Sequence, residues 1–115
     1  MHYTEEILKQ LPFAVTICNL EAKIIYMNEK SAVTFVKYGG IDLVGKSLYD
    51  CHGPHAEEKI KELIETSGTN AYTIEKNGIN KMIYQCPWYK DGEIAGLAEL
   101  SLVIQKEMKH FVRKS

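Results

Sequence analysis

The sequence predicts an α+β domain built on a five-stranded antiparallel sheet, with helices on one face and a flanking helix at each end of the chain. Segments rich in β-branched and aromatic residues flank short polar turns at 13–27 and again at 70–104, the pattern of antiparallel hairpins. Between them, residues 28–68 carry helix caps and apolar residues at helical spacing. Strands on both sides of a helical region indicate one mixed core.

Size, charge and cysteine content restrict the class of protein. The 115 residues are enough for one domain, and the formal net charge of -1 argues against nucleic acid as a partner. No segment resembles a signal peptide, and no apolar run reaches the ~18 residues that cross a membrane. Three widely spaced cysteines do not indicate a disulfide framework. We therefore expect a cytoplasmic protein with reduced thiols and no membrane partner.

The N-terminal part is expected to form a helix followed by a hairpin. Residues 1–11 have one apolar stripe and acidic residues near the start, which predicts an amphipathic cap helix that Pro12 ends. Residues 13–19 and 23–27 are strand-like and are joined by a short polar link.

The middle of the chain is expected to be helical. Asn28 can cap a helix that runs to about Tyr38. Pro54 suits the first turn of a longer helix, which Gly68 closes. Its apolar stripe consists of Ala56, Ile60, Leu63 and Ile64.

Three more strands complete the predicted sheet, at about 70–76, 80–89 and 93–104. Asn77-Gly78 and Lys90-Asp91-Gly92 are the turn signals between them. Apolar residues at heptad-like spacing then predict a C-terminal linker helix over 105–115.

The order and spacing of these segments resemble PAS domains. The resemblance covers about residues 5–104 and is carried by PFAVTICNLEAKIIYMNEKSA, GKSLYD and YQCPWYKDGEIAGLAELS. It implies a PAS domain over 12–104 that acts as a sensory and dimerising module in signal transduction, as in histidine kinases and transcription regulators. It also implies a small-molecule site between the sheet and the central helices, a homodimer, and an output domain or signalling partner. Some relatives hold haem or flavin, and others bind nothing and serve as interaction modules.

The segment Cys51-His52-Gly53-Pro54-His55 contains the ligands that iron and zinc prefer. His52 is the better candidate for a haem ligand, although haem-binding relatives take their histidine from within the central helix, which has none after His55. The alternative is an ordinary helix start, in which these side chains pack or hydrogen-bond locally. The flavin motif Asn-Cys-Arg is replaced by Asp50-Cys51-His52, so flavin is not expected.

The last two strands supply the rest of the predicted site. Alternation groups Met82, Tyr84, Cys86 and Trp88 on one face, which we expect to be the inner one. Placed on the family's final hairpin, Leu97 and Glu99 also face the pocket. The alternative is that Glu99 lies at a solvent-exposed edge of the sheet. The predicted ligand-binding residues are Tyr49, Cys51, His52, Ile60, Tyr84, Cys86, Leu97 and Glu99.

A catalytic role is not expected. Cys51 and His52 could be a nucleophile and its base, but adjacent residues rarely bring their side chains within reach of each other and of an orienting group. No acyl-transfer or phosphate-loop motif accompanies them. The prediction is a non-enzymatic sensor.

Overall fold

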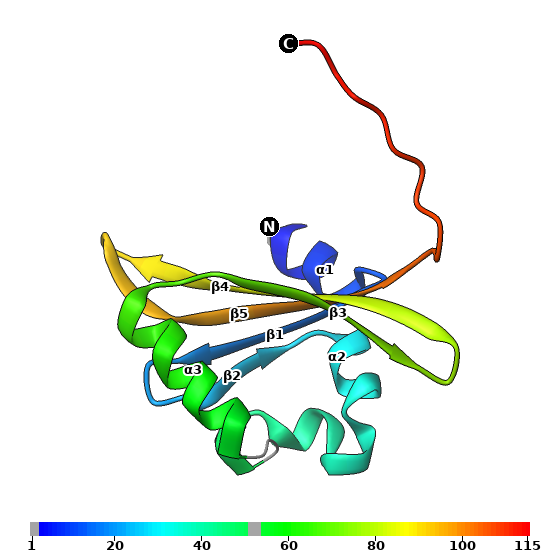
Figure 1. Ribbon diagram of the computed structural model, residues 1–115. Coiled ribbons are helices and arrows are strands. Elements are labelled where there is room, and N and C mark those ends of the chain that lie inside the picture. Colours follow the sequence, from blue (N-terminus) through cyan, green and yellow to red (C-terminus); the bar gives the residue numbers. More distant parts are fainter. Residues whose placement is uncertain (1–2, 51–53) are drawn as a thin grey trace.

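The computed structural model describes residues 3–50 and 54–115, and its architecture is a five-stranded antiparallel sheet with helical segments packed on it (Figure 1). The predicted α+β fold is confirmed. The elements in chain order are α1 (Tyr3–Gln10), β1 (Ala14–Asn19), β2 (Ile24–Met27), α2 (Glu29–Thr34), the 3-10 turns η1 (Val36–Tyr38), η2 (Gly40–Leu43) and η3 (Leu48–Asp50), α3 (Pro54–Thr66), β3 (Asn70–Lys76), β4 (Ile79–Lys90) and β5 (Glu93–Ile104).

The strand order is β2-β1-β5-β4-β3, so the strands from the two ends of the sequence meet in the middle of the sheet. β5 pairs with β1 along its middle, from Gly96 to Ser101, and with β4 along nearly its whole length. β2 and β3 are the edge strands. Both predicted hairpins form, and Asn77 and Asp91 each take the positive φ that their two-residue turns require.

The helical segments between the hairpins cover one face of the sheet, the inner face. In Figure 1 α2, the 3-10 turns and α3 lie on one side of the sheet, and α1 lies on the other. The predicted helix from Asn28 to Tyr38 is shorter than expected. α2 ends at Thr34, and a 3-10 turn continues to Tyr38. Gly39 and Gly40 have positive φ and reverse the chain there.

Asn28 fixes the start of α2 against the rest of the fold. Its side-chain oxygen accepts from the backbone N–H of Ser31 at 3.0 Å and of Val15 at 2.9 Å. Its amide donates to the carbonyls of Leu8 and Phe13. The predicted cap is confirmed, and the same side chain also attaches α1 to β1.

The core has two parts on the inner face. Ile60 and Leu63 of α3 pack on Cys18 and Leu97 of the sheet. Ile24 and Met27 of β2 pack against Leu43. The core therefore holds α3 over the centre of the sheet and the 3-10 turns over its β2 edge.

The predicted C-terminal helix is absent, since residues 105–115 form neither helix nor strand in the structure. Met108, Phe111 and Val112 remain exposed there. An isolated helix of this length is marginal in water unless its apolar side packs on something, and heptad-like spacing alone does not supply that surface.

Candidate functional site

A row of polar side chains crosses the inner face of the sheet. Glu99 of β5 lies opposite Thr16 of β1 and Gln85 of β4, and Gln85 lies opposite Asn70 of β3. Residues directly opposite one another on antiparallel strands share a face. Four strands therefore each place one polar residue in a single line under the helices.

The helical layer closes over this row. Among the described residues, a cavity of about 20 Å³ lies over the row, enough for about one water molecule. Its apolar wall comes from α3, η3 and the strands beside them. The lining residues are Thr16, Cys18, Leu48, Ile60, Gln85, Leu97, Ala98 and Glu99.

Hydrogen bonds orient the two ends of the row. Asn70 Nδ2 donates to Gln85 Oε1 at 2.9 Å, which leaves the Gln85 amide to offer N–H groups. At the other end, the Thr16 hydroxyl is hydrogen-bonded to the Ser31 hydroxyl. The row thus places a carboxylate at Glu99 beside an amide at Gln85.

The negative charge of Glu99 acts on two neighbouring acids. Burial raises the pKa of the Cys18 thiol, a hydrogen bond from the backbone of Leu97 partly opposes this, and Glu99 raises that pKa further. Burial, and then Glu99, also raise the pKa of the Tyr72 phenol on β3. Both groups therefore stay protonated at pH values above the ordinary pKa of a thiol or a phenol.

Comparison with solved structures places this arrangement in a known fold. A sensory box sensor histidine kinase from Vibrio cholerae superposes with a TM-score of 0.65 at 18% identity, covering 90% of each chain. The PAS domain of an HTR-like protein from Haloarcula marismortui gives 0.63 at 12%, covering 89% of each. This chain has the PAS fold. VqmA from Vibrio cholerae gives 0.71 at 17%, with all of this chain matching 58% of VqmA.

Sequence comparison does not extend this result, since no family model and no curated protein matches the chain. The PAS fold is therefore established from structure and from the residue pattern. No described helix is long and apolar enough to cross a membrane. Within residues 3–50 and 54–115, no three His, Cys, Asp or Glu side chains gather as a metal site.

The PAS fold brings together part of the predicted site. Ile60, Leu97 and Glu99 line the same small cavity, so Glu99 takes the inward one of the two positions left open for it. Tyr49 packs against the core cluster that contains Ile60 and Leu97, and the Lys61 ammonium lies 5.5 Å from the centre of its ring. Cys51 and His52 lie outside the described residues.

Tyr84 and Cys86 were predicted on the wrong face. Glu99 faces the helices, and the residue opposite it is Gln85, so Tyr84 and Cys86 point to the outer face. Met82 and Trp88, grouped with them by alternation, lie there too. Tyr84 is 37% exposed. Alternation shows which residues share a face but not which face the helices cover.

A β-bulge determines which residue of β4 lies opposite Glu99. The turn pairs Tyr89 with Ile94, but Trp88 pairs with Gly96, so Ala95 is an extra residue on β5. A regular hairpin would have placed Tyr84 opposite Glu99, whereas the one-residue shift places Gln85 there.

A hydrogen bond between distant strands lies beside the bulge. The Trp88 Nε1 donates to the Cys18 carbonyl at 2.9 Å across Gly96, which has no side chain to prevent this approach. Sequence analysis therefore missed Gln85, Thr16 and Asn70. The signal for them was Gly96, because a glycine inside a strand often marks a bulge, but it was not interpreted as one.

Proposed function

We propose that this PAS domain is a non-catalytic sensor in signal transduction that binds a small polar molecule between its sheet and α3. The observation that supports this is the position of Glu99 opposite Gln85 on the inner face of the sheet. This pair favours a ligand with an amine or hydroxyl that donates to the Glu99 carboxylate. The same ligand needs an acceptor for the N–H groups of the Gln85 amide.

Energetics support a recognition role for these side chains. Carboxylates and amides turned toward a covered face lose hydration, which costs free energy unless partners replace the water. Apolar residues such as Leu97, which faces the same side two positions earlier, would pack there without that cost. A polar row under α3 is therefore more useful for recognition than for packing.

The small size of the cavity couples binding to movement. A space of about 20 Å³ admits no ligand larger than water, so a metabolite must move α3 away from the sheet. The contacts that change are those of Ile60 and Leu63 on Cys18 and Leu97. A ligand that binds only the displaced arrangement shifts the population toward it, which is the physical requirement for a signal.

The structural neighbours are consistent with this role. VqmA has been solved bound to DPO, and another neighbour is a sensor histidine kinase. At below 25% identity these proteins support the class of function and not the identity of the ligand.

The test is a binding screen by ¹H–¹⁵N NMR on the full chain. The probes are individual small amines, amino acids and polyols, added to wild type, Glu99→Gln and Gln85→Leu. We expect at least one probe to shift the amides of Ile60 and Glu99 in wild type, with affinity about tenfold lower in Glu99→Gln, since a charged hydrogen bond contributes about 1.5–3 kcal/mol.

Tyr84→Phe is the control for this screen, because Tyr84 lies on the outer face. Its affinity should equal that of wild type. If the shifts persist unchanged in both inner-face variants, the proposed site is wrong. An absorption spectrum of the purified protein checks the haem alternative. A Soret band that is present in wild type and lost in His52→Ala would show that the ligand is haem and not a metabolite.

We further propose that the domain forms a homodimer through the outer face of its sheet. Leu100 and Tyr84 are opposite one another there, and neither is fully buried. In Figure 1 α1 covers only part of this face. Partly exposed apolar side chains on a sheet face are suited to pairing with a second copy.

A further inference from the structure

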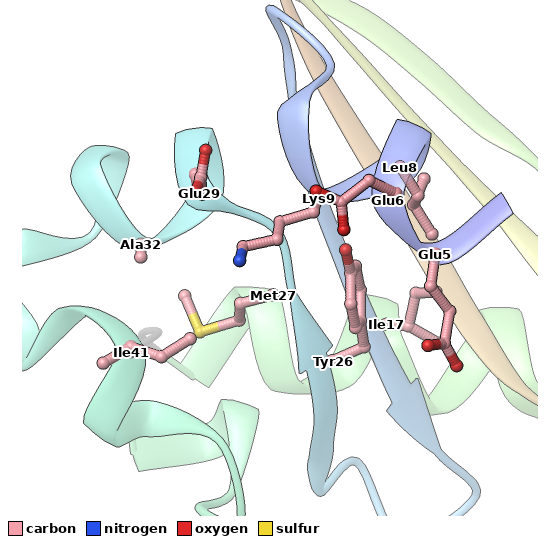
Figure 2. A pocket seen from close by; sticks show the side chains of 10 residues that line it. All are labelled: Glu5, Glu6, Leu8, Lys9, Ile17, Tyr26, Met27, Glu29, Ala32 and Ile41. Carbon is pink, nitrogen blue, oxygen red and sulfur yellow. The ribbon is translucent and has the colours of Figure 1, made fainter. Parts of the chain in front are cut away.

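A second, much larger hollow lies away from the polar row, at the edge strand β2. It has a volume of about 820 Å³ and runs between α1, β2, α2 and η2 (Figure 2). We call it the β2 groove. Its residues are Glu5, Glu6, Leu8, Lys9, Ile17, Tyr26, Met27, Glu29, Ala32 and Ile41.

The β2 groove is apolar in its floor and acidic at its rim. Ile17, Met27 and Ile41 supply apolar surface. Glu5, Glu6 and Glu29 supply three carboxylates against the single ammonium of Lys9. The groove therefore favours a partner that combines apolar side chains with positive charge.

Tyr26 presents an unused hydrogen-bonding group to the groove. Its ring rises from β2 with the hydroxyl toward α1, as Figure 2 shows. The hydroxyl oxygen is buried and has no hydrogen-bond partner among the described residues. Burial and the nearby charges of Glu29 and Glu5 raise the pKa of this phenol, so it remains a donor. Buried polar groups without partners are rare and call for an explanation.

The C-terminal segment 105–115, the tail, has the complementary chemistry. Met108, Phe111 and Val112 are 61%, 68% and 86% exposed. They alternate with positive charges, which are Lys106, Lys109, Arg113 and Lys114 against the single acidic residue Glu107. The tail has no regular structure, so its backbone carbonyls can accept hydrogen bonds.

The tail begins within reach of the groove. Ser101 pairs with Ala14, so the end of β5 at Ile104 lies beside the link between α1 and β1. Eleven extended residues span at most about 36 Å, whereas the eight residues of α1 measure about 12 Å. In the structure Gln105 and Met108 lie beside the β3–β4 hairpin. Docking therefore requires only a turn near Gln105 toward α1, on whose side of the sheet the tail extends in Figure 1.

From this complementarity we infer that the β2 groove is a docking site for the tail of the same chain. Phe111 and Val112 occupy the apolar floor, and Lys109 and Arg113 face the carboxylates of α1 and α2. A tail carbonyl accepts from the Tyr26 hydroxyl, which α1 must first uncover because the hydroxyl oxygen is buried. The structure then represents the undocked arrangement, and α1 and α2 belong to a switch that the tail opens and closes. The inference is independent of any ligand at Glu99.

The test is ¹⁵N relaxation of the tail amides in the full chain. In 50 mM NaCl we expect order parameters of residues 109–113 above about 0.6, the limit of a flexible backbone, and below it in 500 mM NaCl. The double variant Lys109→Glu/Arg113→Glu should be flexible at both salt concentrations. Adding Glu5→Lys/Glu29→Lys to this double variant should make the tail ordered again, because the positive and negative charges have then exchanged places between the tail and the groove.

A control variant and two outcomes decide the inference. Lys23→Glu/Lys90→Glu changes the same net charge beside the β1–β2 and β4–β5 turns, outside the groove lining, and should leave the tail ordered. A wild-type tail that is flexible in 50 mM NaCl overturns the inference. Order that appears only as protein concentration rises from 50 to 500 µM also overturns it, because the occupant would then be the tail of a second copy.

Discussion

Glu99 of β5 lies directly opposite Gln85 of β4, on the face of the sheet that α3 covers. The pair lies in the middle of the polar row, between Thr16 of β1 and Asn70 of β3. It also places a negative charge near Cys18 and Tyr72.

Removing that charge should lower both affected pKa values. Glu99→Gln keeps the shape of the side chain, and we expect the pKa of Tyr72 to move toward its ordinary value. Burial remains as the larger cause, so the return is partial. NMR titration of the Tyr72 ring measures the change. Glu93→Gln, on the exposed start of β5, is the control and should leave Tyr72 unchanged.

The buried thiol of Cys18 should make stability fall at alkaline pH. Its pKa is higher in the folded chain than in the unfolded chain, so its stabilising effect is full below the unfolded value of about 8.5. It is lost as pH rises through the folded pKa, because the unfolded state releases its proton first. Urea unfolding between pH 7 and 10 tests this. Cys18→Ala should reduce the pH dependence, and an unchanged slope would contradict the prediction.

Gly96→Ala should be strongly destabilising. A Cβ at this position would lie 1.9 Å from the Cys18 carbonyl oxygen and 2.7 Å from Trp88 Nε1. Removing this clash requires the bulge to open and β1 to move. We therefore expect the free energy of unfolding, measured in urea, to fall by about 3 kcal/mol or more. Gly78→Ala is the comparison. Nothing lies within 4 Å of its Cβ, and only the positive φ opposes it, at a cost of about 1–2 kcal/mol.

Asn28→Ala should remove the hydrogen bonds that hold the start of α2 against α1 and β1. Two backbone N–H groups and two carbonyls lose their partner at once, and the N–H groups of Val15 and Ser31 are buried. We expect a loss of about 3 kcal/mol in the free energy of unfolding. Asn19→Ala, which removes an oxygen that accepts two exposed turn amides, should cost about 1 kcal/mol. Equal effects would show that burial is not the cause.

Leu100→Asp should weaken self-association if the outer face forms the dimer. Leu100 points to that face, and a carboxylate there would have to be desolvated in the interface. Sedimentation velocity over a concentration series measures the change. Val103→Asp is the control on the same strand, since Val103 is exposed on the opposite face. A variant at Leu100 with the mass of wild type would contradict a dimer at this face.

Local patterns in the sequence determined the elements and their order. The turns at Asn77 and Asp91, the cap at Asn28 and the helix beginning at Pro54 depend on nearby residues, so they could be predicted without a fold. The inward position of Glu99 followed from the resemblance to PAS domains. The C-terminal helix could not be predicted in this way, because a short amphipathic segment is helical only when another surface covers it.

The tertiary structure alone decided which side chains meet. One extra residue at Ala95 changes the register, and a shift of one residue exchanges the two faces of β4 relative to β5. That shift replaces Tyr84 and Cys86 with Gln85 in the site beside Glu99. Beside the shift, Trp88 crosses Gly96 and donates to the Cys18 carbonyl, a contact between residues 70 positions apart in the chain. Periodicity along one strand carries no information about such a contact.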